Sequence, residues 1–259
     1  MLTSTHNPRI KNLLALEKPR VRRETGLFII EGIKELSLAI EAQYELTNVF
    51  YCPAIISQNA FESLDLPESI LVPVSEAVFE KIAYRKTTGG VVAIAKQRNH
   101  RLANIFLSDN PLVLVLESVE KPGNLGALLR TADAAKLDAV IICDPQTDFY
   151  NANVVRSSVG CLFTTQLAAA TSEETIEWLR NNKIEIYCTY LEGSVRYDRV
   201  DFKQPSAIVM GTESTGLSDL WINSSDQNIK IPMRGKIDSM NVSVAAAVTV
   251  FEALRQRGF

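Results

Sequence analysis

The side chains best suited to chemistry lie in three short polar stretches within residues 112–259. The first is KPGNLGALLR, in which Arg130 follows Asn124 by six positions. Pro122 and Gly123 predict a turn, and Asn124 is then placed to cap a helix. A guanidinium less than two helical turns from a free helix N-terminus suits recognition of a phosphate or another oxyanion. The alternative interpretation of Arg130 is a surface salt bridge.

The second polar stretch is a glycine-rich turn, GTESTGLS, that carries one carboxylate, Glu213. It imitates the phosphate-binding loop of nucleoside triphosphatases, in which a lysine follows the second glycine. Leu217 occupies the lysine position here. Because the main cation of such a loop is missing, the turn does not indicate a nucleoside triphosphatase.

The third polar stretch is KIDSMNVSV, in which Ser239, Asn241 and Ser243 stand directly before a run of small residues. Hydroxyl and amide groups in such a loop can orient a substrate, and each could instead simply cap a helix. Each of the three polar stretches could have its own structural explanation, such as a helix cap. One shared site explains all three more simply.

Apolar runs precede all three polar stretches and predict how they are positioned. Residues 112–116 and 207–210 are short continuous apolar runs, which are typical of strands buried on both faces of a parallel sheet, and a third strand is expected to lead into the segment that begins at Ile229. In open α/β sheets, ligands bind where loops leave the carboxyl ends of the strands. We therefore expect the three polar loops to meet in one pocket.

The order of apolar and amphipathic segments indicates an α/β protein with two domains. Residues 1–96 predict a small α/β domain, residues 97–110 a polar linker, and residues 111–259 an α/β domain with a parallel sheet. The second domain is expected to contain strands at 112–116, 139–143, 164–167, 184–189, 206–210 and 228–231, and helices at 124–135, 151–159, 173–181 and 242–257.

Basic side chains are concentrated at the N-terminus although the net charge of the chain is −3. Six basic residues within the first 23 positions stand against a single acidic one, Glu17. Such a cluster can hold a phosphate backbone, or it can form an ordinary solvated helix face. The residues predicted to bind nucleic acid are Arg9, Arg20, Arg22 and Arg23.

The remaining composition excludes several classes of protein. The four cysteines are far apart without CxxC spacing, which predicts reduced core residues, and a metal site is not expected with only two histidines. No apolar stretch reaches the roughly 18 residues of a membrane span, and the first residues do not resemble a signal peptide. The expected location is the cytoplasm, with no membrane partner.

Taken together, the three polar stretches resemble the signature motifs of a known family. N-x-G-x-x-x-R (Asn124, Gly126, Arg130), G-x-E-x-x-G (Gly211, Glu213, Gly216) and I-P-M…S-x-N-V-S (231–233 and 239–243) are similar to the motifs of the TrmH/SpoU branch of the SPOUT RNA methyltransferases. FIIEG, from Phe28, and GGVVAIA, from Gly89, resemble the RNA-binding domain related to ribosomal protein L30e.

This resemblance implies a SPOUT α/β-knot, with a C-terminal trefoil knot and a mostly parallel sheet, preceded by an L30e-like domain. It further implies a homodimer that binds S-adenosylmethionine and methylates a ribose 2′-hydroxyl of RNA. Ribosomal RNA is favoured over transfer RNA because a basic-tipped domain precedes the catalytic one. The cofactor contacts fall on Gly211, Ile231 and Met240, and the catalytic positions on Arg130, Asn124, Glu213, Ser239 and Asn241.

Three alternatives to this interpretation differ in what the chain would bind. A transfer RNA 2′-O-methyltransferase would share the catalytic domain, and a non-catalytic RNA-binding or assembly protein would keep only the fold. Intact Arg130, Glu213 and Asn241 argue against the latter. A dinucleotide-dependent oxidoreductase lacks support because no G-x-G-x-x-G opens the first helix of the second domain.

Overall fold

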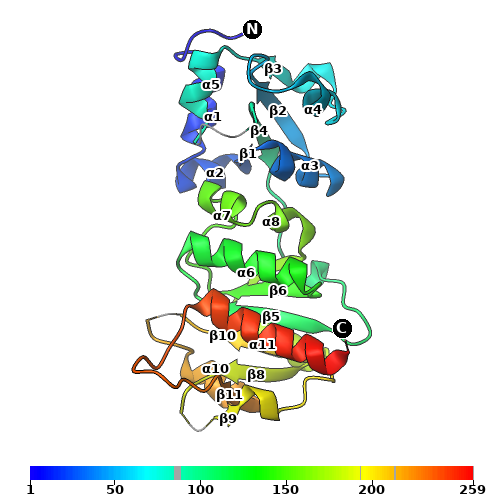
Figure 1. Ribbon diagram of the computed structural model, residues 1–259, viewed down its shortest axis with the longest axis vertical. Helices are drawn as coiled ribbons and strands as arrows, with labels where there is room; N and C mark the ends of the chain where they lie inside the picture. The colour runs from blue at the N-terminus through cyan, green and yellow to red at the C-terminus, as the bar shows by residue number, and fades with distance from the viewer. Residues whose placement is uncertain (85–88, 193, 213, 259) are drawn as a thin grey trace. The chain divides into compact units, whose positions relative to one another are not determined.

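The computed structural model describes residues 1–84, 89–192, 194–212 and 214–258, which form two compact units (Figure 1). The first unit comprises Met1–Arg98 together with Asp148–Thr164, and the second comprises Asn99–Thr147 together with Thr165–Phe259. The sequence-based division at residues 97–110 assigned residues 148–164 to the C-terminal domain. In the structure this segment packs with the N-terminal unit instead.

The N-terminal unit is built on a four-stranded mixed sheet with the order β1-β4-β2-β3. β4 pairs antiparallel with β1 and β2, and β2 pairs parallel with β3. The strands are β1 (Leu27–Glu31), β2 (Leu46–Tyr51), β3 (Leu71–Pro73) and β4 (Val91–Lys96). The helices are α1 (Pro8–Ala15), α2 (Pro19–Thr25), α3 (Ile33–Glu41), α4 (Gln58–Glu62), α5 (Glu76–Ile82), α7 (Ala152–Ser157) and α8 (Cys161–Thr164), with a 3₁₀ turn η1 at Glu68–Ile70.

Local sequence explains the first helix of this unit. The Asn7 side chain accepts a hydrogen bond from the Arg9 amide at 2.9 Å, which caps α1 at its N-terminus. Ile10 and Leu13, three positions apart, lie on one helix face and are fully buried. Arg9, at the start of the same helix, is exposed at the surface.

An aromatic cluster joins residues 148–164 to the rest of the N-terminal unit. The rings of Phe28 and Tyr150 lie 4.3 Å apart, and those of Tyr44 and Phe163 lie 5.0 Å apart. Gly160 approaches α3 so closely that a Cβ atom there would lie 2.5 Å from a methyl carbon of Leu38. These contacts bury one face of the sheet beneath a segment that is distant in sequence.

Arg22 was predicted to bind RNA, and its position corrects that prediction. Its side chain is only 2% exposed, and its Nε donates to Asp148 Oδ2 at 2.7 Å. Nη1 donates to the carbonyl oxygens of Leu16 and Glu17 at 2.7 and 2.8 Å. Because this guanidinium lies inside the unit, it serves to connect α2 to residues 148–164 and is not available to a phosphate.

We expect removal of one partner of the Arg22–Asp148 pair to destabilise the protein strongly. Arg22→Met should lower the free energy of unfolding by about 3 kcal/mol, because the Asp148 carboxylate would lose its partner. Arg20→Met is the matched control, since Arg20 forms an exposed i,i+4 pair with Glu24 that contributes well under about 1 kcal/mol. Urea unfolding measures both variants. Equal midpoints for Arg22→Met and the parent protein would contradict this role.

The second unit contains a seven-stranded sheet in the order β7-β6-β5-β10-β8-β11-β9, in which every neighbouring pair is parallel. This agrees with the predicted α/β class and its mostly parallel sheet. The strands are β5 (Leu112–Glu117), β6 (Ala139–Cys143), β7 (Leu167–Ala170), β8 (Glu185–Thr189), β9 (Val195–Arg196), β10 (Ser206–Met210) and β11 (Gln227–Lys230). The helices are α6 (Pro122–Ala134), α9 (Ser172–Asn181), α10 (Asp219–Ser224) and α11 (Val242–Arg257), with 3₁₀ turns η2 at Leu102–Asn104 and η3 at Tyr197–Arg199.

Helices cover both faces of this sheet. α6 and α11 run side by side over one face (Figure 1). On the other face, Leu179 of α9 and Trp221 of α10 pack against alternate residues of the central strands, such as Val113 and Val209. β5, β6 and β10 are buried along their whole lengths, as expected for strands covered on both sides.

The cysteines occupy the positions expected of core residues. Cys52, Cys143 and Cys188 are buried as thiols, and Cys161 is half-buried. Burial raises the pKa of the Cys143 and Cys188 thiols to about 12. These two thiols therefore stay protonated near neutral pH and are poor nucleophiles.

Candidate active site

A cavity of about 690 Å³ opens at the carboxyl ends of β8, β10 and β11. Its walls come from the segment after β8, the turn after β10, the loop from β11 to α11, and the first turns of α11. The sheet is parallel, so these strand ends share one edge, and their loops converge there. Of the predicted site residues, the cavity is lined by Gly211, Ile231, Ser239, Met240 and Asn241.

Gly211 forms a closely packed part of the cavity wall. It follows β10 and precedes a turn in which Thr212 and Gly216 exchange two backbone hydrogen bonds, at 3.1 and 3.2 Å. A Cβ atom on Gly211 would lie 2.5 Å from the backbone nitrogen of Leu217 and closer still to the carbonyl of Gly216. Only glycine fits here without moving the turn. Glu213, predicted as a catalytic residue, lies outside the described residues.

Asn124 and Asn241 come together although 117 residues separate them in the chain. Asn241 Nδ2 donates a hydrogen bond to Asn124 Oδ1 at 3.1 Å. Asn241 Oδ1 accepts from the Ser243 amide at 3.0 Å and from the Ser243 hydroxyl at 2.6 Å, which caps α11. α6 begins at Pro122, so Asn124 lies in its first turn rather than at its cap. The side-chain bond thus joins the starts of α6 and α11.

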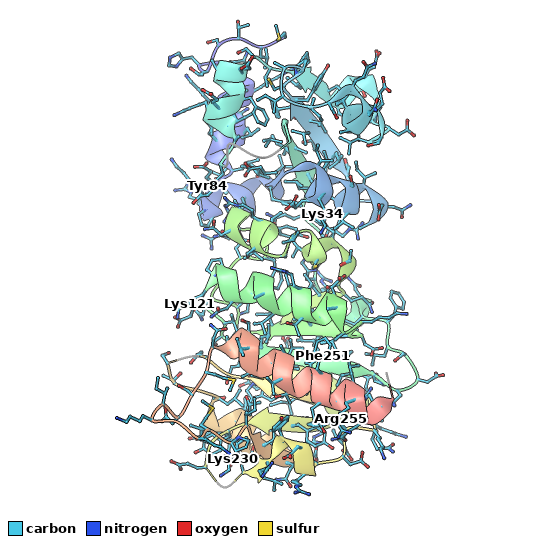
Figure 2. The ribbon with its side chains drawn as sticks, viewed as in Figure 1. Lys34, Tyr84, Lys121, Lys230, Phe251 and Arg255 are labelled. Atoms are coloured by element: carbon cyan, nitrogen blue, oxygen red, sulfur yellow. The ribbon has the colours of Figure 1, made fainter. Side chains whose placement is uncertain are left out.

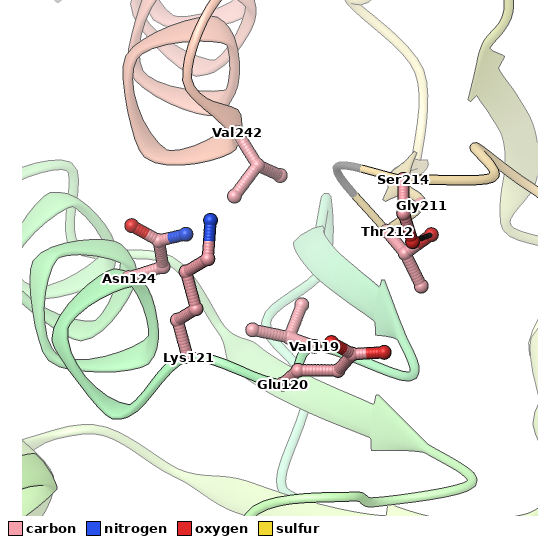
Figure 3. Close-up of a pocket in the computed structure, with 8 residues that line it drawn as sticks. All are labelled: Val119, Glu120, Lys121, Asn124, Gly211, Thr212, Ser214 and Val242. Carbon is pink, nitrogen blue, oxygen red and sulfur yellow. Dashed lines mark hydrogen bonds between the residues drawn. The ribbon is translucent and has the colours of Figure 1, made fainter.

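A smaller hollow of about 90 Å³ lies beside this pair (Figure 3). Lys121 and Asn124 lie on one side of it and face Gly211, Thr212 and Ser214 on the other. Lys121 brings a cation into the site that the motifs did not reveal. A lysine before a Pro-Gly turn has no distinctive spacing, so the sequence held no signal for it.

The turn after β10 is also tied to the neighbouring strand. Glu117, the last residue of β5, is only 8% exposed, and its Oε2 accepts a hydrogen bond from the Ser218 amide at 2.8 Å. A carboxylate that accepts a backbone N–H forms one of the stronger hydrogen bonds found in proteins. Glu117 therefore fixes the base of the loop that carries Gly211.

Arg130 does not line either of these two cavities of its own chain. It lies on the exposed side of α6, and its side chain forms no hydrogen bond or ion pair with any other described residue. The site within one chain thus contains Asn124, Asn241 and the cavity-lining residues. It does not contain the guanidinium of Arg130, which the sequence motifs predicted there.

Two other kinds of feature are absent from the part of the chain that the structure describes. Among residues 1–84, 89–192, 194–212 and 214–258, no group of three or more His, Cys, Asp or Glu side chains is arranged to hold a metal ion. In the same part of the chain, no helix has the length and apolar character needed to cross a membrane.

Comparison with known proteins identifies the family. Residues 111–251 match the model of the SpoU rRNA methylase family, and residues 7–93 match that of the MRM3-like substrate binding domain. The chain therefore belongs to the SpoU rRNA methylase family, as the three motifs indicated.

Individual relatives extend over nearly the whole chain. The 23S rRNA (guanosine(2553)-2'-O)-methyltransferase RlmP of Bacillus subtilis is 27% identical and aligns with 96% of this chain and 97% of its own. A crystal structure of AdoMet-bound rRNA methyltransferase from Sinorhizobium meliloti has a TM-score of 0.90 and 31% identity, and covers 98% of this chain and 97% of that one. The TrmH/SpoU tRNA modifying enzyme of A. aeolicus, with a TM-score of 0.51 and 25% identity, covers 57% of this chain and 76% of that one.

Proposed function

We propose that this protein transfers the methyl group of S-adenosylmethionine to a ribose 2′-hydroxyl of ribosomal RNA. The observation that carries this proposal is the cavity at the ends of β8, β10 and β11, next to the bonded pair Asn124 and Asn241. A ribosomal substrate is favoured over transfer RNA because the likeness to the rRNA methyltransferase includes the N-terminal unit, whereas the likeness to the tRNA enzyme covers little more than half of the chain. Because the proposed substrate is ribosomal RNA, we also propose that the protein is located in the cytoplasm.

The cavity fits S-adenosylmethionine in size and in chemistry. Its volume of about 690 Å³ falls within the range of typical small-molecule sites. Ile231, Met240 and Val242 supply apolar surface for an adenine ring, and Thr189 and Ser239 supply hydroxyl groups for a ribose. The backbone around Gly211 can approach the ligand closely because no side chain intervenes. When bound, this cofactor supplies an electrophilic methyl group on a sulfonium.

The polar residues would act mainly by positioning the nucleophile. A ribose hydroxyl is a weak nucleophile, so the site must align it with the methyl group and lower the cost of removing its proton. Asn241 and Asn124, fixed by their mutual hydrogen bond, are suited to orient the hydroxyl, with Ser239 at the cavity wall. A guanidinium stays protonated in proteins, so Arg130 is better suited to hold the phosphate beside the target ribose than to act as a base.

A homodimer is part of the proposal because Arg130 lies away from the cavity of its own chain. Val244, Val248 and Phe251 follow one another at helical spacing on α11, where Val244 and Phe251 are 51% and 37% exposed and Val248 is half-buried. Figure 2 labels Phe251 on this helix. Exposed apolar residues in one row favour a protein contact. A partner packed along α6 and α11 would bring its own Arg130 toward this cavity. Light scattering should give twice the 28.7 kDa mass of the chain, and the mass of one chain would contradict the dimer.

Titration calorimetry with S-adenosylmethionine separates this function from a non-catalytic RNA-binding role. The proposed enzyme should bind the cofactor with a stoichiometry of one per chain in the absence of RNA. A folded protein that binds RNA but takes up no cofactor would instead favour an assembly factor that has kept the fold.

RNA binding by the N-terminal unit is proposed to use the exposed arginines of α1 and α2. Arg9, Arg20 and Arg23 are exposed, and Arg20 forms an ion pair with Glu24. Replacing Arg20 and Arg23 by Glu should weaken RNA binding and reduce the slope of log K against log salt by about 0.7 for each phosphate that is no longer neutralised. Cofactor affinity should not change. A salt slope equal to that of the parent protein would remove these residues from the interface.

A further inference from the structure

An exposed aromatic ring in the N-terminal unit is held flat against a cation. Tyr84 follows α5, and the guanidinium carbon of Arg156, in α7, lies 3.7 Å from the centre of its ring. Tyr84 is nevertheless 70% exposed. Since the guanidinium covers one face of the ring, an exposure this large requires that the opposite face and the hydroxyl edge lie in solvent.

Neighbouring hydrogen bonds fix both members of this pair. The Tyr84 amide donates to Glu31 Oε1 at 2.7 Å, which ties the backbone of Tyr84 to the end of β1. Arg156 Nη2 donates to Asn153 Oδ1 at 2.7 Å, one helical turn earlier in α7. Arg156 Nη1 is buried without a hydrogen-bond partner among the described residues, so the guanidinium is held by the Asn153 hydrogen bond together with its stacking on the ring.

Several other aromatic side chains of this unit serve a different purpose. Phe28, Tyr150 and Phe163 bury their rings against one another beneath the sheet. Tyr84 contributes little buried area, and a cation–π contact at an exposed site adds little stability. A ring with one free face, fixed before any ligand arrives, is therefore better explained as a surface for binding than as part of the core.

We propose that Tyr84, backed by Arg156, is a stacking platform for an unpaired nucleobase of RNA. Every base presents a flat π face, so stacking on a tyrosine requires no particular sequence. Arg156 adds positive charge near the strand without occupying the free face of the ring. Unpaired bases are also the usual targets of RNA-binding proteins, because paired bases are hidden within the helix. The platform rests on the proposed function in that its ligand is the RNA substrate.

The test uses the full-length protein and a single-stranded oligoadenylate of about 12 nucleotides that carries one 2-aminopurine. Stacking of 2-aminopurine on an aromatic ring quenches its fluorescence, and anisotropy of the same RNA gives the dissociation constant. The parent protein and Tyr84→Phe should both quench the probe. Tyr84→Leu, which keeps bulk but removes the ring, should lose the quenching and bind roughly 5- to 100-fold more weakly. The quenching and the affinity of Arg156→Gln should lie between those of the parent protein and those of Tyr84→Leu.

Two features distinguish stacking from other roles of Tyr84. The salt dependence of binding should be the same in Tyr84→Leu as in the parent, because the variant keeps every cation that faces a phosphate. The melting temperature should also be unchanged, because the side chain is largely exposed. Equal quenching and equal affinity for Tyr84→Leu and Tyr84→Phe would overturn the platform. So would a parent protein that binds this RNA without quenching it.

Failure of the platform can be told apart from failure of the proposed function. Cofactor binding and methyl transfer are measured without reference to Tyr84. Normal methyl transfer to ribosomal RNA together with an unaffected Tyr84→Leu variant would overturn the platform alone. Conversely, the parent protein could fail to transfer a methyl group while Tyr84→Leu still weakens RNA binding. That result would support the platform and overturn the proposed methyltransferase activity.

Discussion

Arg130→Ala should lower the rate of methyl transfer in a single turnover by roughly 100- to 1,000-fold, the usual cost of removing one group that stabilises developing charge. The reason is that Arg130 is proposed to hold the phosphate beside the target ribose and to stabilise the forming alkoxide. Its side chain forms no hydrogen bond or ion pair with the described residues of its own chain that the substitution would disturb. The affinity for S-adenosylmethionine, measured by calorimetry, should therefore be unchanged.

Matched variants make this result specific to Arg130. Arg130→Lys keeps the charge but loses the planar pair of donors, so it should recover only part of the rate. Arg101→Ala removes an exposed arginine of the same unit that lines neither cavity, and it should behave as the parent. Rates near the parent value for both Arg130 variants would contradict any role for Arg130 in the reaction.

Mixing two inactive variants tests whether Arg130 acts on the partner's site. Arg130→Ala and Asn241→Ala subunits should each be nearly inactive alone. If Arg130 of one subunit serves the cavity of the other, mixed dimers contain one site with both residues intact and should regain activity. No recovery from subunits that are shown to exchange would indicate that Arg130 and Asn241 must come from the same chain.

Gly211→Ala should weaken S-adenosylmethionine binding by on the order of 10- to 100-fold, which corresponds to the cost of overpacking a closely packed site. The added methyl group would overlap the backbone of Gly216 and Leu217, so the turn must move away from β10. That turn forms the wall of the cavity and is anchored to Glu117 through Ser218, so it has little freedom to adjust.

Gly123→Ala is the control for this substitution. Gly123 lies in the first turn of α6, and a Cβ atom there would meet no other atom of the described residues within 4 Å. Calorimetry should show parent-like cofactor binding for Gly123→Ala and the weakened binding for Gly211→Ala. Circular dichroism of both variants should match that of the parent. Tight cofactor binding by folded Gly211→Ala would mean that the cofactor binds elsewhere.

The central strands could be predicted because their signal is local. Residues 112–116 and 207–210 are continuous apolar runs, and both lie in strands that are buried along their entire lengths. Periodicity was less informative between residues 161 and 170, where a strand was expected at 164–167. Thr164 instead ends α8 and the strand spans Leu167–Ala170, because consecutive small and apolar residues do not mark where a strand starts.

Long-range partners were beyond the reach of sequence patterns. Arg22 lies among exposed basic residues in the sequence, and nothing local distinguishes it from Arg23. Its burial depends on Asp148, 126 positions away. Likewise, residues 148–164 were expected in the C-terminal domain because they follow its strands, yet the helices α7 and α8 of this segment pack within the N-terminal unit. Hydrophobic periodicity shows that a helix has an apolar face, but not which sheet covers it.

The contact between Asn124 and Asn241 could be anticipated only in part. Parallel strands predicted that the polar loops would share one edge of the sheet, and this bond joins two of them. The position of Arg130 could not be derived in the same way, because a helix residue on the exposed side belongs to no loop. Its proposed role therefore depends on the arrangement of two chains.

The most direct test of the account is to map 2′-O-methyl groups, at nucleotide resolution, on ribosomal RNA incubated with the purified protein and S-adenosylmethionine. The RNA should come from cells that lack the protein. We predict a new methyl group on a ribose 2′-oxygen, absent when Asn241→Ala or Gly211→Ala replaces the parent protein. Methylation of a base but of no ribose would contradict the proposed function. So would a protein that binds both RNA and S-adenosylmethionine but methylates no RNA.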